Sequence, residues 1–380
     1  MFKVSADCHA NEPARYLAEY IEPEFVDRIP RVEEHDDGSL WMITEGNRPQ
    51  LLKAGRPVDG QPAPRPTGSR MDDEDLRRNA SGRTAADRLA DQDADGVSIE
   101  LIFPNKGLLC WATPDPHFAM AMCRAWNRWA YDAHGGADGW YGGRMLPLAS
   151  IATGDIDGAL AEIRWAADHN MVGLCFGNSP VYGPKVGGNL EYNDPAFEAV
   201  WSLVAETGLP VTFHVSTGRD PRAVTGPGGA ITNYVCHSME TTIEPLVQLI
   251  TSAVFERHPT LKVGMVESGI GFVPWLLETM DYAHRAHHFW VKPTLQELPS
   301  TYFRRNCFAT FQEDHVGLRH AEADGLTQNL MWANDYPHHE GSWPHSTASI
   351  ERQMGNLSTD ARAQILGLNA ARVFNLHVPV

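Results

Sequence analysis

Eight short apolar segments recur along this chain, and stretches with helical periodicity separate most of them. They cover residues 2–6, 97–103, 144–151, 172–176, 210–213, 261–266, 306–311 and 329–333. Several are almost continuously apolar, which is typical of parallel strands that are buried on both faces. Eight such strands alternating with helices within 380 residues predict an α/β fold, a (β/α)8 TIM barrel. A doubly wound sheet is disfavoured because no glycine-rich dinucleotide fingerprint follows the first strand.

Apolar residues spaced three and four apart predict helices over residues 116–133, 155–168, 196–206, 240–254, 269–288 and 361–374. Residues 22–83 depart from this alternation, since they are polar and rich in proline, glycine and arginine. We interpret residues 1–380 as a single barrel with residues 22–83 inserted after the first strand, on the catalytic face. A small hairpin is expected around residues 40–43, and residues 60–66 are expected to be extended or mobile.

Composition narrows the classes of function. The formal net charge of -17 argues against binding to nucleic acid or an anionic membrane surface, which requires clustered lysine and arginine. No apolar stretch reaches the length of a transmembrane helix, and no signal peptide is recognised. The six cysteines form no C-x-x-C pair, so we interpret them as reduced thiols of a cytoplasmic protein.

Acidic residues and histidines follow the predicted strands where a barrel has its active site, at the carboxyl ends. Asp7 and His9 end the first strand and point the same way because side chains alternate along a strand. His214 ends the fifth strand, Glu267 the sixth and Asp335 the eighth. Each alone also fits a turn, a helix cap or a surface histidine, but together they predict a metal site.

Four segments, residues 5–13, 210–214, 266–271 and 332–338, resemble the amidohydrolase superfamily. The resemblance is to its branch of decarboxylases that act on aminocarboxymuconate semialdehyde and γ-resorcylate. It implies one divalent metal ion, Zn²⁺ or Mn²⁺, held by Asp7, His9, His214 and Asp335. An aspartate at position 7 departs from the common His-x-His form and shifts the expected preference toward harder ions such as Mn²⁺.

The resemblance also implies catalytic roles near this metal. Asp335 is expected to shuttle the proton of metal-bound water. His338 lies three residues further on and could act as an acid or base, or orient a ligand. Glu267 stands where many members carry a catalytic histidine, so it is a third candidate, and the mechanism cannot be transferred directly.

Three functions remain open from the sequence. We expect first a hydrolase that attacks a small carbonyl-containing or cyclic substrate with metal-activated water. The alternative is a non-oxidative decarboxylase of a small aromatic or unsaturated carboxylic acid. A second alternative is a barrel that has lost catalysis and binds a ligand. The partner in each case is a small molecule, and the resemblance further implies a homodimer.

Overall fold

The chain folds into a (β/α)8 barrel. The computed structural model describes residues 1–46, 49–53, 82, 84–183, 190–217, 224, 226–287, 289–290 and 292–378. The barrel strands are β1 (Val4–His9), β5 (Ile99–Phe103), β6 (Met145–Pro147), β7 (Ala149–Ile151), β8 (Leu174–Phe176), β9 (Val211–His214), β10 (Val263–Val266), β11 (Cys307–Phe311) and β12 (Leu330–Trp332). Neighbouring strands pair in parallel in the orders β1-β5-β6 and β7-β8-β9-β10-β11-β12. All eight predicted strands are present.

The third strand differs in detail from the prediction, whereas the first agrees with it. The third segment, predicted as one strand, is divided at Leu148 into β6, which pairs with β5, and β7, which pairs with β8. The apolar segment at the start of the chain covers residues 2–6, and β1 extends beyond it through Asp7 to His9, as predicted for the end of the first strand, because residues 8 and 9 pair with β5. Asp7 and His9 therefore lie within a strand, where the pairing fixes their backbone.

The barrel closes between its first and last strands. The His9 amide donates a hydrogen bond to the Tyr336 carbonyl at 2.6 Å, and the Asp335 amide donates to the Asp7 carbonyl at 3.0 Å. Cys8 and Tyr336 form a parallel bridge at the same place. The carboxyl ends of β1 and β12 are thereby held side by side.

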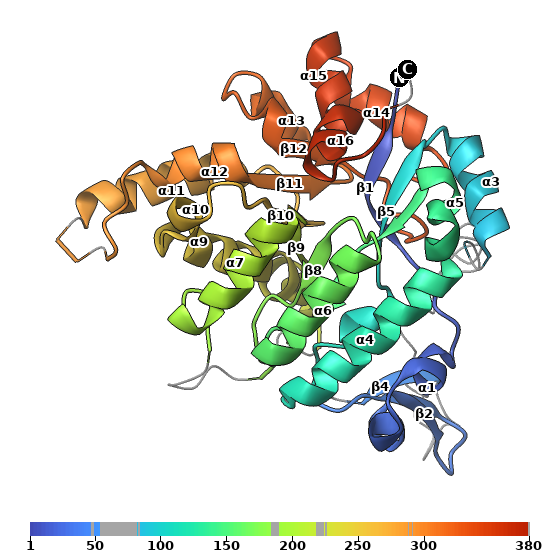
Figure 1. Ribbon diagram of the computed structural model, residues 1–380. Helices are drawn as coiled ribbons and strands as arrows, with labels where there is room; N and C mark the ends of the chain where they lie inside the picture. The colour runs from blue at the N-terminus through green and yellow to red at the C-terminus, as the bar shows by residue number, and fades with distance from the viewer. Residues whose placement is uncertain are drawn as a thin grey trace.

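Helices surround the barrel (Figure 1). The longer ones are α3 (Ala85–Asp95), α4 (Pro116–Ala133), α6 (Ile156–Asp168), α7 (Glu198–Thr207), α9 (Ile243–Thr251), α11 (Val273–Ala286), α12 (Pro299–Asn306), α13 (His315–Ala321) and α14 (Ser346–Met354). Asp115 and Asp155 cap α4 and α6 by accepting hydrogen bonds from the first-turn amides, as their sequence positions suggest. The two chain termini lie close together in both ribbon views.

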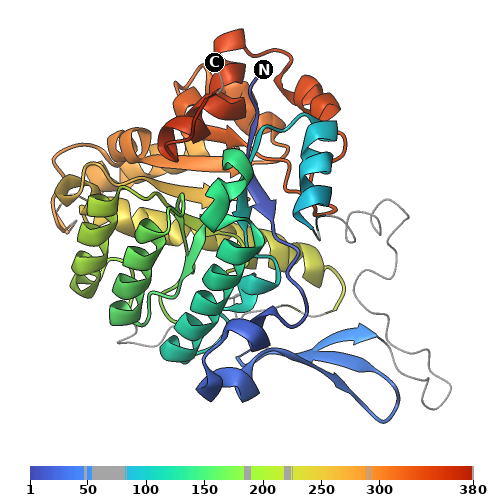
Figure 2. The same cartoon turned by 45° about the vertical axis from the view of Figure 1, so that its right-hand side comes forward.

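The region inserted after β1 contains a small antiparallel sheet of β2 (Arg31–Glu34), β3 (Leu40–Ile43) and β4 (Gln50–Lys53). Only a hairpin was predicted here. The sheet projects on the side toward which β1 runs (Figure 2). Arg28 anchors it to the loop before α4 through ion pairs with Glu45 at 2.7 Å and Asp115 at 2.9 Å. The predicted extended stretch of residues 60–66 lies outside the described residues.

Large apolar side chains fill the space between the barrel and its helices. The bulkiest fully buried ones include Trp126, Trp201 and Trp332. Within the described ranges, no helix combines the length and apolar character needed to cross a membrane.

Candidate metal centre

The side chains predicted for the site meet at the carboxyl ends of the barrel strands. Asp7 and His9 come from β1, His214 is the last residue of β9, Glu267 follows β10, and Asp335 follows β12. Glu267 is 5% exposed and the other four are completely buried. Polar side chains are rarely buried to this degree without partners, so their mutual arrangement requires an explanation.

The ring nitrogens of the two histidines face the carboxylates. His214 Nε2 lies 3.2 Å from an Asp7 oxygen and 3.6 Å from a Glu267 oxygen. His9 Nε2 lies 3.5 Å from Asp7, 3.4 Å from Asp335 and 4.0 Å from Glu267. One potential ligand atom from each of Asp7, His9, His214 and Glu267 lies within 4.8 Å of all the others. Asp335 forms a second such group with His9 and His338.

Backbone carbonyls set the tautomers of both imidazoles. The Nδ1 atom of His9 lies 2.8 Å from the Pro104 carbonyl oxygen, and that of His214 lies 2.8 Å from the Val215 carbonyl oxygen. A carbonyl only accepts, so each Nδ1 carries the hydrogen and donates it. Each neutral ring then presents the lone pair of Nε2 to the carboxylates, which is the arrangement found for metal-binding histidines.

The two histidines have opposite pKa shifts. Burial, together with His338 and His214, lowers the pKa of His9 well below its usual range, so this ring is neutral. Burial also acts to lower the pKa of His214, but the neighbouring Asp7 and Glu267 carboxylates outweigh it and raise the pKa. A metal ion would displace the proton that His214 gains in this way.

Two carboxylates of the site carry backbone strain and raised pKa values. Glu267 and Asp335 have φ angles of 63° and 53°, in the left-handed region that residues with side chains seldom adopt. Such strain costs about 1–3 kcal/mol and is concentrated at functional sites. Burial and Asp335 raise the pKa of Glu267, whereas burial and Asp7 raise the pKa of Asp335, with a smaller opposing effect from Gln312. The carboxylates therefore repel one another.

His338 extends the site toward solvent. Its Nδ1 lies 3.0 Å from an Asp335 oxygen, and its ring stacks on His9 at a centroid distance of 4.0 Å. Its side chain is 21% exposed, unlike the buried ligands below it. His338 is therefore the member of the cluster that an incoming molecule would reach.

The residues present fit a divalent cation. His9 Nε2, Asp7 Oδ2 and both Asp335 carboxylate oxygens are buried without a hydrogen bond of good geometry, although Gln312 is close enough to lower the pKa of Asp335. Among the described residues, no lysine or arginine forms an ion pair with Asp7, Glu267 or Asp335. In the described part of the chain, lone pairs and negative charges thus converge without a lysine or arginine partner, which is the donor set that a metal ion satisfies.

Sequence patterns missed a second buried cluster, which we call the support network. Its members are Ser5, Arg88, Asp95, Glu100, Asn334 and Ser346. Arg88 Nε lies 2.5 Å from a Glu100 oxygen, and its Nη1 donates to the His9 carbonyl at 2.7 Å. Asn334 accepts a hydrogen bond from Ser5 at 2.8 Å and donates to Asp95 at 3.2 Å. The one sequence feature that could have indicated this network is Glu100, a charged residue within an apolar strand.

Comparisons with known proteins agree with this geometry. The family model described as Amidohydrolase matches residues 6–376. A comparison with curated protein sequences found no significant match.

Solved structures share the fold at low sequence identity. An amidohydrolase from Mycobacterium avium subsp. paratuberculosis K-10 aligns with a TM-score of 0.76 and 20% identity, covering 99% of both chains. A 5-carboxyvanillate decarboxylase from Sphingomonas paucimobilis aligns with a TM-score of 0.64 and 20% identity, again over 99% of both chains. A dihydroxybenzoic acid decarboxylase from Polaromonas sp. JS666 aligns with a TM-score of 0.65 and 16% identity, over 100% of this chain and 98% of that chain.

The family match covers almost the whole chain, and it includes every residue of the candidate metal centre. The barrel and its strand-end cluster agree with that match. This chain belongs to the amidohydrolase family.

Proposed function

We propose that the protein is a metal-dependent decarboxylase of a small carboxylic acid. The observation that carries this proposal is the buried cluster of Asp7, His9, His214 and Glu267, together with Asp335 at 3.4 Å from His9. The Nδ1 atoms of both histidines donate to backbone carbonyls, which leaves each Nε2 available to a metal ion. Hydrolysis was the first expectation from the sequence. The similar structures, which include a 5-carboxyvanillate decarboxylase and a dihydroxybenzoic acid decarboxylase, support the decarboxylase alternative better.

Asp7, His9, His214 and Asp335 would hold one divalent ion. When bound, the ion would supply the positive charge that holds the carboxylate and a neighbouring oxygen of the substrate. Manganese is our preferred ion because three carboxylates lie in the cluster and oxygen ligands suit it. In support, the structure of the dihydroxybenzoic acid decarboxylase from Polaromonas contains bound manganese and the inhibitor 2-nitroresorcinol.

His338 and Asp335 would move the proton that the reaction requires. Loss of carbon dioxide leaves the electron pair of the broken carbon–carbon bond on the substrate carbon, and that carbon must gain a proton. The His338–Asp335 contact of 3.0 Å places the imidazole beside the carboxylate on the more exposed side of the site, where the two groups could pass a proton to that carbon. The stacking of His338 on His9 fixes the plane of its ring while this transfer occurs.

Turnover assays test the proposal. The protein loaded with Mn²⁺ would be incubated with 2,6-dihydroxybenzoate, 5-carboxyvanillate and further hydroxybenzoates, and carbon dioxide release would be measured. We expect release from at least one acid and none from the H214A variant. Hydrolysis of lactones or amides without decarboxylation would favour the hydrolase instead. Bound metal without turnover of either set would favour a ligand-binding barrel.

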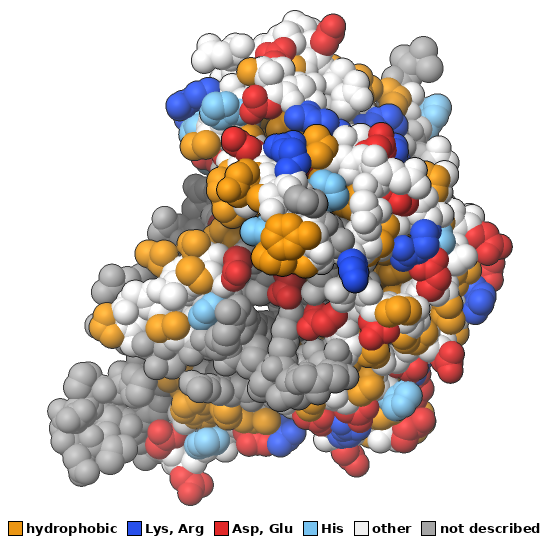
Figure 3. Space-filling model, turned by 90° about the vertical axis from the view of Figure 1, so that its left-hand side faces the viewer, with side chains coloured by type: hydrophobic (Ala, Val, Ile, Leu, Met, Phe, Trp, Pro, Cys, Tyr) orange, Lys and Arg blue, Asp and Glu red, His pale blue; other side chains and the backbone are white. Residues whose placement is uncertain are grey.

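We also propose that two copies associate through the face around α11. Trp275 and Tyr282 are 62% and 66% exposed and seven residues apart on α11, so they lie on one side of the helix. Phe289, in the turn beyond the helix, is 63% exposed. Figure 3 shows hydrophobic side chains gathered on this side of the molecule. Large exposed apolar patches are typical of protein interfaces.

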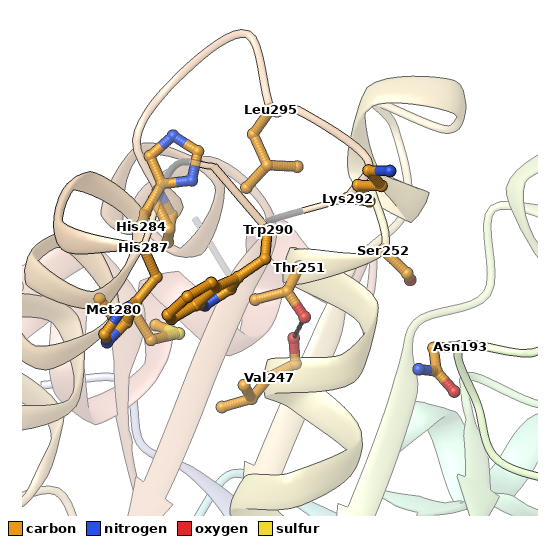
Figure 4. A pocket seen from close by; sticks show the side chains of 12 residues that line it. Asn193, Val247, Thr251, Ser252, Met280, His284, His287, Trp290, Lys292 and Leu295 are labelled. Carbon is orange, nitrogen blue, oxygen red and sulfur yellow. Dashed lines mark hydrogen bonds between the residues drawn. The ribbon is translucent and has the colours of Figure 1, made fainter.

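A cavity of about 400 Å³ lies beside this face, between α9 and α11 (Figure 4). Met280, His284, Trp290 and Leu295 are among its lining residues, and the residues of the candidate metal centre are not. A side chain of the second copy could fill it.

Sedimentation analysis should show a dimer for the wild type, a monomer for Tyr282→Glu and an unchanged dimer for Val316→Glu, an exposed site on α13. A monomeric wild type would refute this interface.

A further inference from the structure

Glu267 has no role in the proposed reaction, yet it lies at the centre of the cluster. Its side chain is almost completely buried, and within the described ranges its ion-pair contacts are to His9 and His214 alone. A buried carboxylate without a cationic partner is costly, so its position needs a compensating interaction. We propose that Glu267 is a direct ligand of the metal, which gives a set of three carboxylates and two imidazoles that selects Mn²⁺ over Zn²⁺.

The first argument is the direction of the histidine lone pairs. Glu267 Oε2 lies 3.6 Å from His214 Nε2 and 4.0 Å from His9 Nε2, which is too far for a hydrogen bond. Both Nδ1 atoms donate to carbonyls, so the Nε2 lone pair of neutral His9 faces the carboxylates, and that of His214 does so once a metal ion displaces its extra proton. Lone pairs facing a carboxylate repel it unless a cation lies between them. Ligand atoms that each lie about 2.1 Å from one ion are themselves roughly 3 Å apart, close to the spacing seen here.

The second argument is that the fold holds Glu267 in place at a cost. Its φ of 63° is strained, and its amide donates to the Thr310 hydroxyl on β11 at 3.0 Å. The next residue, Ser268, is fixed in turn by a hydroxyl contact of 2.6 Å with Thr242. Strain that neighbouring strands maintain in this way is typical of a functional position.

The third argument is that the geometry groups Glu267 with the metal ligands. Asp7, His9, His214 and Glu267 form the set of four mutually close ligand atoms, whereas Asp335 is close to His9 and to Glu267 in two further groups. Adding Glu267 to the ligands gives three anionic oxygen donors. Carboxylates suit Mn²⁺, whereas a set richer in imidazole suits Zn²⁺. Glu267 therefore sets the identity of the metal.

Metal binding distinguishes a ligand from a nearby charge. We would compare the wild type with Glu267→Gln and Glu267→Ala, and use Glu340→Gln as the control. Glu340 is another acid within reach of Glu267 and Asp335, but it is exposed and contacts His339. The measurements are Mn²⁺ affinity by chelator competition, the electron paramagnetic resonance spectrum of bound Mn²⁺, and the Mn:Zn ratio after loading with equal amounts of both ions.

We expect Glu267→Ala to weaken Mn²⁺ binding by at least about 100-fold, since changes to residues that only orient ligands already cost 10- to 100-fold. Glu267→Gln should change the Mn²⁺ spectrum and shift the loaded ratio toward zinc, and Glu340→Gln should do neither. Unchanged affinity and spectrum in Glu267→Gln would overturn the inference, as would an equal effect of Glu340→Gln. Glu267→Gln keeps the side-chain shape and decides the matter if Glu267→Ala does not fold.

This inference rests on the metal centre of the proposed function, but the two can fail separately. A wild type that binds no divalent ion refutes both. A wild type that binds Mn²⁺ and releases carbon dioxide, with Glu267 variants of normal metal affinity, refutes the role of Glu267 alone.

Discussion

Two buried polar clusters include residues of the first strand, and they differ in how completely their atoms are paired. In the support network, the carboxylates of Asp95 and Glu100 accept hydrogen bonds from Asn334, Ser346 and Arg88. Only Arg88 Nη2 lacks a hydrogen bond there, and the guanidinium lies 4.9 Å from the Tyr336 ring centroid. In the candidate metal centre, several carboxylate and imidazole atoms have no hydrogen-bond partner.

This difference in hydrogen bonding distinguishes polar residues buried for stability from polar residues buried for function. A paired network stabilises the fold by itself, whereas an unpaired one is stable only with something bound. Substitutions in the support network should therefore lower stability. Substitutions in the candidate metal centre should instead abolish metal binding and decarboxylation. They should have little effect on the stability of the metal-free protein. Four experiments test this contrast.

The largest effect is expected from His214→Ala. It removes a ligand, so metal affinity should fall by at least about 100-fold and decarboxylation should be lost. The unfolding free energy of the metal-free protein should fall by less than in Arg88→Met, because the ring gives up only its hydrogen bond to the Val215 carbonyl and its contacts with the neighbouring carboxylates. Metal content, carbon dioxide release and urea unfolding measure these effects. His117→Ala, at an exposed histidine, should change none of them.

Arg88→Met should cause the largest loss of stability. It leaves Glu100 buried without its partner, and breaking a buried ion pair from one side costs about 3–5 kcal/mol. Urea unfolding measures the loss, and Glu100→Gln in the same chain should recover part of it. Arg144→Met, which breaks the more exposed pair with Asp93, should cost less than about 1 kcal/mol. Equal losses in the two single variants would contradict the proposed importance of burial.

Removal of the metal should destabilise the wild type but not the His214→Ala variant. At a Mn²⁺ concentration about 1,000-fold above the dissociation constant, binding adds about 4 kcal/mol to the unfolding free energy. Urea unfolding with and without a chelator measures this difference. The His214→Ala variant should show almost none. If the chelator had no effect on the wild type, the unpaired atoms of the centre would not be a metal site.

Asp95→Ala should have the smallest of the four effects, about 3 kcal/mol of lost stability. Asp95 accepts hydrogen bonds from Asn334 and from the Ser346 backbone, and each hydrogen bond to a charged group contributes at least about 1.5 kcal/mol. Metal affinity per folded molecule should be unchanged. Asp93→Ala, in the same helix but largely exposed, is the control for urea unfolding. A loss of affinity in Asp95→Ala would mean that the two clusters are coupled.

The same contrast explains what could be predicted from the sequence. Strand-end residues such as Asp7 and His214 could be identified because polar residues that follow apolar strands lie together at the carboxyl-terminal end of a barrel. Arg88 was not, since its partners are set by how α3 packs on β1. The carbonyls of Pro104 and Val215, which set the histidine tautomers, leave no trace in residue type. The division at Leu148 also depends on how the barrel curves.

The backbone hydrogen bonds that join β1 to the segment after β12 have a consequence for biosynthesis. Ser5 and Asn334 are separated by 329 positions, and the ligands beside them come from opposite ends of the chain. Contacts so distant in sequence form late, because the intervening loop must be closed first. A nascent chain on the ribosome would present Asp7 and His9 long before Asp335 has been synthesised. Loading of the proposed metal would therefore wait until the segment after β12 has been synthesised, and a chain truncated before β12 would expose an unclosed sheet edge.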